Sequence, residues 1–311
     1  MYPIDSFASA NDLYTDTVQL QGCELHHHDA SHRLIEQDHL LRWSVECLVA
    51  LGMQFEHALI VSQGVCRSCA HRGDAAPVDA LLNEMDQIRS GSLSVEPGHE
   101  AGSRSNNSLA VCKGHGISLL ALHDSVEFLR HAAVAHGWAA VELDTCAYGD
   151  AALVYLDAAA REGFGGLAVL TNGSGWEAVR IVAALPQGEH GSEVFQVPML
   201  LLLAAGPVVQ VQEPPGIGMF AADFLGGSVA LEDWFFRVRP GGVQLLVATP
   251  DRFAGPMSEF RSRLLANGVV PHRGLDHGAS GGRAAPAIPV EPLVLQRMCS
   301  WSRDLSVFTP G

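Results

Sequence analysis

The stretch that most constrains the fold is residues 115–172, where helical and extended patterns alternate within one short segment. Apolar residues recur at helical spacing over 116–136, and Gly137 follows as a helix end. Two short apolar runs, Trp138–Leu143 and 166–171, are typical of buried strands, and residues 149–162 between them have a helical pattern. This alternation predicts a mixed α/β core.

Composition narrows the class of protein. The chain has 311 residues, of which 48% are hydrophobic, so it can bury a sizeable core in one or two domains. Its formal net charge of −15 argues against a nucleic-acid partner, which requires a basic surface. No apolar run reaches the ~18 residues of a membrane span, and the first residues do not form a signal peptide. Seven scattered cysteines are typical of reduced thiols, so we expect a cytoplasmic protein.

The rest of the chain predicts an arm, a helical domain and a central domain. Residues 1–30 lack periodicity and are expected to form an extended arm. Helices are expected at 31–52, 53–63, 77–90, 218–230, 257–267 and 291–303, strands at 179–184, 197–203, 208–212 and 243–249, and loops at 92–107 and 273–289. We therefore predict a helical domain formed by 31–110 with 257–311, and a central α/β domain at 111–256.

Residues 115–172 resemble the malate/L-lactate dehydrogenase-like oxidoreductases, a family that also contains ureidoglycolate, sulfolactate and cyclic-imine reductases. The resemblance implies the mixed-sheet fold of that family, with a helical domain built from both ends of the chain, and a homodimer. It also implies an NAD(P)H cofactor. The candidate positions are His115 and Gly116, where helix amides can hold an anion, and Thr171 and Asn172 after the second strand.

The catalytic groups of that family are replaced in this chain. The family places a histidine in an Asn-His-Phe-Gly turn, which is Cys146-Ala147-Tyr148-Gly149 here. Its Arg-Gly-x-Asp-Ser-His-Gly turn corresponds to residues 67–73, where His71 survives, and the arginine that follows it is Ala75. The position of an active-site aspartate is Leu203, and the loops that build the nicotinamide site are not visible. Hydride transfer to an oxo acid needs a proton donor and a cation for the carboxylate, so ordinary dehydrogenase activity is not expected.

Four residues are candidates for chemistry other than hydride transfer in the substrate cleft that the family resemblance implies. His71 is a candidate for proton transfer, with an exposed loop histidine as the alternative interpretation. Asp144, Cys146 and Tyr148 follow a predicted strand and are expected to line the cleft as base, nucleophile and proton donor. The alternative for Tyr148 is aromatic packing.

A second constellation has the residue types of a metal site. Cys66-x-x-Cys69-x-His71 carries thiolates and an imidazole at a spacing that suits zinc or copper, and Cys23 and His26 to His28 precede it in the sequence. No second Cys-x-x-Cys closes a tetrahedral site, so we expect no metal and interpret Cys66 and Cys69 as small packed residues.

Three functions remain open. The leading hypothesis is a repurposed small-molecule enzyme of a specialised biosynthetic pathway. It would carry out cyclisation, isomerisation or elimination on a small amino- or oxo-acid derivative. The second is an NAD(P)H-dependent reductase of a keto acid or cyclic imine, because an imine can be protonated before hydride arrives. The third is a non-catalytic scaffold or partner subunit. A small closed pocket with converging polar groups would favour the first hypothesis.

Overall fold

The computed structural model places its described residues in one compact unit, His32–Gly311. It describes residues 32–96, 100–105, 108–112, 116–143, 146, 148–149, 151–171, 179–187, 191–197, 242–249, 256–266, 269, 271–273 and 287–310.

A mixed sheet forms the centre of this unit. Its strands lie in the order β2-β3-β4-β8-β5-β6-β7-β9. They are β2 (Glu100–Ser105), β3 (Ser108–Cys112), β4 (Trp138–Leu143), β5 (Gly165–Thr171), β6 (Val179–Gln187), β7 (Gly191–Val197), β8 (Val243–Ala248) and β9 (His272–Arg273). β3 and β4 run parallel, and all the other neighbouring pairs are antiparallel. Every residue of β8 is buried, as expected for a central strand that lies between β4 and β5.

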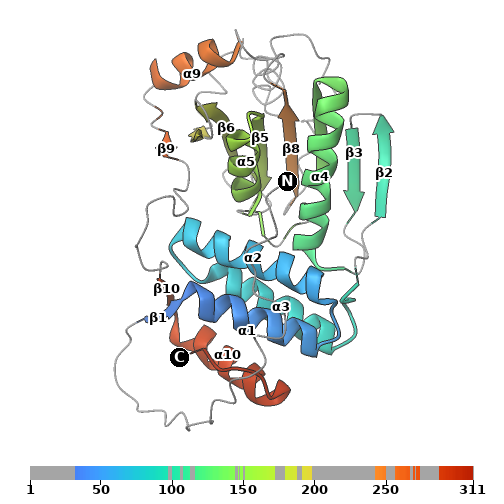
Figure 1. Ribbon diagram of the computed structural model, residues 1–311, viewed down its shortest axis with the longest axis vertical. Coiled ribbons are helices and arrows are strands. Elements are labelled where there is room, and N and C mark those ends of the chain that lie inside the picture. Colours follow the sequence, from blue (N-terminus) through green and yellow to red (C-terminus); the bar gives the residue numbers. More distant parts are fainter. Residues whose placement is uncertain are drawn as a thin grey trace, which may run out of the picture. The chain divides into compact units, whose positions relative to one another are not determined.

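Two helices cover one face of this sheet (Figure 1). Helix α4 (Ser118–His136) packs on β3, β4 and β8, and α5 (Ala151–Arg161) packs on β5, β6, β7 and β8. Gly137 ends α4 in the left-handed conformation, with φ of 85°, where a side chain would be strained. The helix–strand–helix–strand prediction for residues 115–172 is therefore confirmed.

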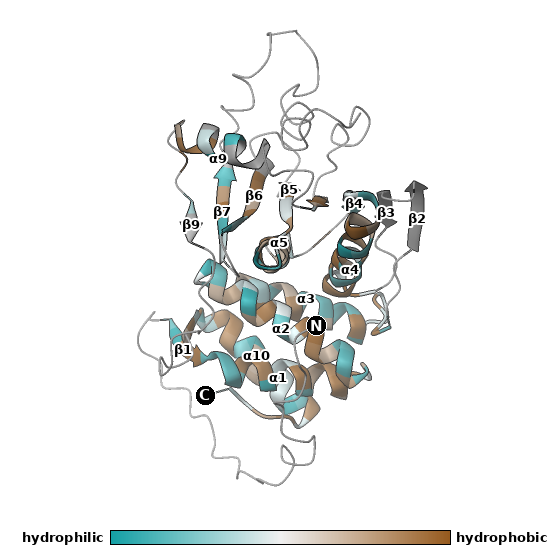
Figure 2. Cartoon of the chain, turned by 45° about the horizontal axis from the view of Figure 1, so that its top comes forward, coloured by the Kyte–Doolittle hydropathy of each residue, from teal (hydrophilic) through white to brown (hydrophobic). Residues whose placement is uncertain are grey.

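A layer of four helices packs against α4 and α5 through α2. The layer consists of α1 (Gln37–Ala50), α2 (Phe55–Arg72), α3 (Ala76–Arg89) and α10 (Pro292–Leu305), and it carries a small sheet of β1 (Arg33–Glu36) and β10 (Ala287–Val290). Brown apolar and teal polar residues share each of α1, α2 and α10, as expected for helices with one buried face (Figure 2). Both ends of the described chain thus contribute to the helical layer, as predicted.

Specific bonds join the two ends of the chain within this layer. The indole N–H of Trp43 on α1 donates to Ser302 Oγ on α10 at 3.0 Å, and both residues are buried. The Arg297 guanidinium on α10 donates to the side-chain oxygens of Asn83 and Asp86 on α3, at 2.9 and 2.8 Å. These contacts fix α10 against α1 and α3.

Gly64 sets how closely α2 approaches α4. A Cβ at this position would lie 2.3 Å from Cδ2 of Leu119, far inside van der Waals contact. A Cβ there would force the Leu119 side chain to shift, and its absence lets α2 cross directly over the first turn of α4. Because of this crossing, the α2 side chains one turn before and one turn after Gly64 face α4 and α5.

The structure corrects two of the predictions for this region. Residues 53–63 were predicted as a helix ahead of a turn at 67–73, but α2 continues to Arg72, because small and apolar residues keep its buried face intact past Gly64. Residues 92–107 were predicted as a loop, but β2 occupies 100–105 and pairs with β3. The Gly- and Ser-rich sequence of β2 has no strand pattern of its own, and the segment is a strand because it pairs with β3.

Other predictions are confirmed or lie outside the described residues. The strands at 179–184 and 243–249 and the helices at 77–90, 257–267 and 291–303 correspond to β6, β8, α3, α9 (Pro256–Ala266) and α10. The arm at 1–30, the strand at 208–212 and the helix at 218–230 lie outside the described residues. No helix in the described part of the chain is long and apolar enough to cross a membrane.

Candidate functional site

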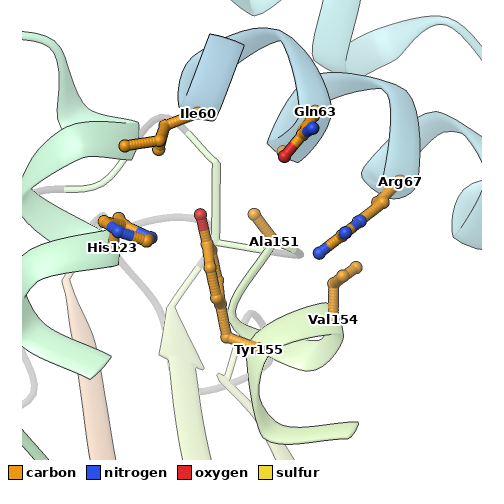
Figure 3. Close-up of a pocket in the computed structure, with 8 residues that line it drawn as sticks. Ile60, Gln63, Arg67, His123, Ala151, Val154 and Tyr155 are labelled. Atoms are coloured by element: carbon orange, nitrogen blue, oxygen red, sulfur yellow. The ribbon is translucent and has the colours of Figure 1, made fainter. Parts of the chain in front are cut away.

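A small pocket of mixed polar and apolar lining lies where α2, α4 and α5 meet (Figure 3). Its lining residues are Ile60, Gln63, Gly64 and Arg67 from α2, His123 from α4, and Ala151, Val154 and Tyr155 from α5. The α2 residues follow the spacing i, i+3, i+4 and i+7, so one face of that helix forms a wall. The volume is about 80 Å³, which suits a compact ligand of a few heavy atoms.

The Tyr155 hydroxyl points into this pocket, between His123 and Gln63 (Figure 3). Burial raises the pKa of Tyr155 well above its ordinary value, and the nearby Arg67 guanidinium only partly opposes this. The hydroxyl therefore stays protonated at neutral pH and acts as a hydrogen-bond donor. The His123 ring packs beside the Tyr155 ring, with centroids 6.0 Å apart and planes tilted by 58°.

Arg67 brings a positive charge to the pocket (Figure 3). Other arginines of this structure pair with carboxylates, as Arg161 does with Asp157 and Arg261 with Glu193. Within the described ranges, no carboxylate lies within ion-pair distance of Arg67. A guanidinium beside a pocket is suited to binding an anionic group of a ligand through its paired N–H donors.

A buried carboxylate organises the chain next to the pocket. Glu84 on α3 accepts hydrogen bonds from the Ser118 amide at 3.1 Å, the Ser118 hydroxyl at 2.7 Å and the Tyr148 hydroxyl at 3.0 Å. Its position at the first turn of α4 is favoured by the helix dipole. These bonds tie the turn before α5 to the helical layer, and burial together with Glu84 raises the pKa of Tyr148.

The predicted catalytic residues that the structure describes are not among the lining residues of the pocket. His71 lies in the last turn of α2, one turn beyond Arg67 and on the same side of the helix, so it is not a loop residue. Cys146 is half-buried and Tyr148 is buried with its hydroxyl on Glu84, which matches the packing alternative for Tyr148. Asp144 lies outside the described residues.

The predicted cofactor residues are only partly described. Gly116 is buried ahead of α4, and the backbone of Thr171 ends β5 beside Val179. His115 and Asn172 lie outside the described residues. The Ser118 amide, which follows Gly116, already bonds to Glu84, so an anion at this helix start would meet a carboxylate.

The two cysteines of the Cys-x-x-Cys sequence are packed core residues. Cys66 and Cys69 are 1% and 0% exposed, and burial raises the pKa of the Cys66 thiol to about 12. A thiol held in its protonated form is a poor metal ligand. In the described part of the chain, no three His, Cys, Asp or Glu side chains gather as metal ligands. Cys23 and His26 to His28 lie outside it.

Sequence reasoning missed the residues that line the pocket. Arg67 was placed in a turn, and His123 and Tyr155 were counted only as members of helices. None of the three belongs to a local motif that would mark it as a site residue. Only the crossing of α2 over α4 and α5 brings the three side chains together.

The fold matches solved structures of dehydrogenases. The malate dehydrogenase of Pyrococcus horikoshii OT3 superposes with a TM-score of 0.58 at 17% identity, covering 92% of this chain and 99% of that chain. The sulfolactate dehydrogenase of Methanocaldococcus jannaschii gives 0.57 at 11% identity, covering 88% and 98%. The malate dehydrogenase of Entamoeba histolytica gives 0.57 at 11% identity, covering 90% and 100%. No protein-family model matches the sequence, and no curated protein matches it.

These structural matches establish the fold. The chain has the malate/L-lactate dehydrogenase-like α/β fold that the resemblance of residues 115–172 implied, over nearly its whole length.

Proposed function

We propose that the protein is a small-molecule enzyme whose active site is the pocket between α2, α4 and α5. The observation that carries this proposal is the convergence of three different functional groups on one small pocket. A guanidinium comes from α2, an imidazole from α4 and a phenol from α5. Rigid helices hold all three groups, as a preorganised site requires.

Each group has a chemical role in this proposal. The Arg67 guanidinium binds the carboxylate of a small amino- or oxo-acid derivative, and Ile60 and Val154 contact its hydrocarbon part. The Tyr155 hydroxyl donates a hydrogen bond, and His123 transfers a proton. These groups are sufficient for an isomerisation, a cyclisation or an elimination, which need proton movement and no reductant.

The predicted residues enter the proposal at the rim of the pocket. His71 lies one turn from Arg67 and is proposed to transfer protons with solvent. Cys146 and Tyr148 belong to the turn that leads into α5, and Asp144 precedes them in the sequence. We propose that this turn closes the end of the site and that Glu84 positions it.

The second candidate function is an NAD(P)H-dependent reductase of a keto acid or cyclic imine. The likeness in fold to malate and sulfolactate dehydrogenases supports it. The bond from the Ser118 amide to Glu84 opposes a phosphate at the start of α4, and the pocket is smaller than a nicotinamide cofactor requires. His115, Gly116, Thr171 and Asn172 stay predictions as cofactor residues.

We further propose a cytoplasmic homodimer that serves a specialised biosynthetic pathway. Within the described part of the chain, Cys47, Cys66 and Cys69 form no disulfide, which suits a reducing compartment. Light scattering on the purified protein tests the dimer. A monomeric mass would contradict it.

Binding of short-chain acids tests the active-site proposal. We expect acetate, pyruvate and glycine to give ligand-observed NMR saturation transfer, which Arg67→Gln abolishes. Arg303→Gln, an exposed arginine on α10, is the matched control and should leave binding unchanged. If both variants bind the acids as the wild-type protein does, the acids bind at another place. Titration with NADH and NADPH on the same sample decides the alternative, since tight binding of either would favour the reductase.

A further inference from the structure

We infer that this pocket catalyses reversible proton removal next to a carbonyl group, with Tyr155 as the hydrogen-bond donor to the carbonyl oxygen and His123 as the base. The inference rests on the proposed function and specifies the reaction at the same site. It assigns a catalytic role to two residues that sequence patterns did not single out.

Of the two tyrosines that the structure describes, Tyr155 is the one that lines the pocket. The Tyr148 hydroxyl is held by Glu84 in the core, at 3.0 Å. The Tyr155 hydroxyl instead points into the pocket, and the described residues offer it no hydrogen-bond partner (Figure 3). A phenol that keeps its proton is suited to stabilising an oxygen on which negative charge develops, and burial keeps the pKa of Tyr155 high.

His123 lies beside Tyr155 at the same pocket. The two ring centroids are 6.0 Å apart (Figure 3), and Gln63 of α2 is a further polar residue of the lining. A carbonyl group that accepts a hydrogen bond from the Tyr155 hydroxyl would therefore have its adjacent carbon close to the imidazole. A donor at the oxygen and a base near the adjacent carbon are what enolisation needs.

The proposed step is balanced without any further reactant. An unprotonated ring nitrogen of His123 takes the proton of a C–H bond adjacent to the carbonyl. The electron pair of that bond forms the carbon–carbon double bond of an enolate, and the carbonyl π pair moves to oxygen, where the Tyr155 O–H stabilises it. Return of a proton from the imidazole to the same or another carbon gives exchange or isomerisation. No atom is oxidised or reduced overall.

Exchange of protons for deuterium tests this step directly. Pyruvate and 2-oxobutyrate are incubated with the full-length protein in D₂O, and loss of the signal of the protons adjacent to the carbonyl is followed by NMR. We expect exchange above the buffer rate. Tyr155→Phe should lower it about 10²–10³-fold and His123→Gln about 10²–10⁴-fold. His131→Gln, an exposed histidine on the same helix, should not change it.

The outcomes separate this inference from the proposed function. Saturation transfer from pyruvate, measured in parallel, should persist in Tyr155→Phe and His123→Gln, because Arg67 still holds the anion. If wild-type protein binds pyruvate without exchanging its protons, the proton-transfer inference is overturned and the binding site stands. If exchange proceeds unchanged in both folded variants, the assignment of donor and base is wrong. If wild-type protein binds no short-chain acid, the proposed function itself fails. Circular dichroism of each variant confirms folding.

Discussion

Alkaline pH should destabilise this protein, because three thiols are buried in its helical layer. Burial raises the pKa of Cys47 and of Cys66 from 9.0 to about 12, and it raises the pKa of Cys69 as well. The folded protein therefore keeps these protons over a range in which the unfolded chain releases them. The stability they contribute is complete below about pH 9 and is lost as the pH rises toward the folded pKa values.

The size of the loss follows from the number of groups. Each thiol whose pKa is raised on folding costs about 1.4 kcal/mol of unfolding free energy per pH unit above its unfolded pKa. At about pH 10.5, roughly 1.5 units higher, three thiols together cost about 6 kcal/mol. A typical domain has a total stability of about 5–15 kcal/mol. Burial also raises the pKa values of Tyr148 and Tyr155, which adds to the loss above about pH 10.

Urea unfolding under reducing conditions measures this effect. The unfolding free energy is determined by circular dichroism at intervals from about pH 7.5 to about pH 10.5. Cys47→Ala should reduce the slope against pH by about 1.4 kcal/mol per unit, whatever it does to stability at neutral pH. Cys299→Ala, a half-buried thiol on α10, is the comparison. A free energy that stays constant over this range would refute the reasoning, since it would mean that the thiols ionise inside the folded protein without cost.

Two packing predictions follow from the contacts of α2 and α3. Gly64→Ala places a Cβ 2.3 Å from Leu119 Cδ2, so urea unfolding should show a loss of about 1–3 kcal/mol. Recovery of part of this loss in the double variant with Leu119→Ala would confirm the clash, and strictly additive losses would contradict it. Glu84→Gln turns an acceptor into a donor facing the hydroxyls of Ser118 and Tyr148, and should cost about 1–3 kcal/mol. Tyr148→Phe should cost less, because Glu84 keeps its bonds to Ser118; the reverse order would exclude this account of the network.

The elements predicted correctly are those with strong local patterns. α4, β4, α5 and β5 combine clear apolar periodicity with glycine stops, so the sequence defines them closely. The predicted end of the second helix near Gln63 was wrong because glycine usually weakens a helix. Here Gly64 instead permits the close contact between α2 and Leu119, which is a tertiary effect. β2 was missed because its Gly- and Ser-rich segment forms a strand only beside β3.

The site was harder to predict than the fold. Family resemblance directed attention to His71 and the turn at 144–148, whereas the described pocket is lined by other residues of α2, α4 and α5. Arg67, His123 and Tyr155 come from three helices separated by more than 30 residues at each step of the sequence. Their convergence depends on the angle between helices, which single-sequence patterns do not contain.

The union of the two chain ends in one layer has a consequence for how the protein is made. The Trp43 indole bonds to Ser302, which lies 259 positions later in the sequence. Closing a loop of that length costs about 5 kcal/mol of chain entropy. During synthesis α1 emerges long before α10, so the helical layer cannot close until the chain has been made through α10. Until then the part of α1 that packs on α10 is uncovered, while α2 can already cover its other contacts. The helical layer therefore makes stable folding conditional on synthesis through α10.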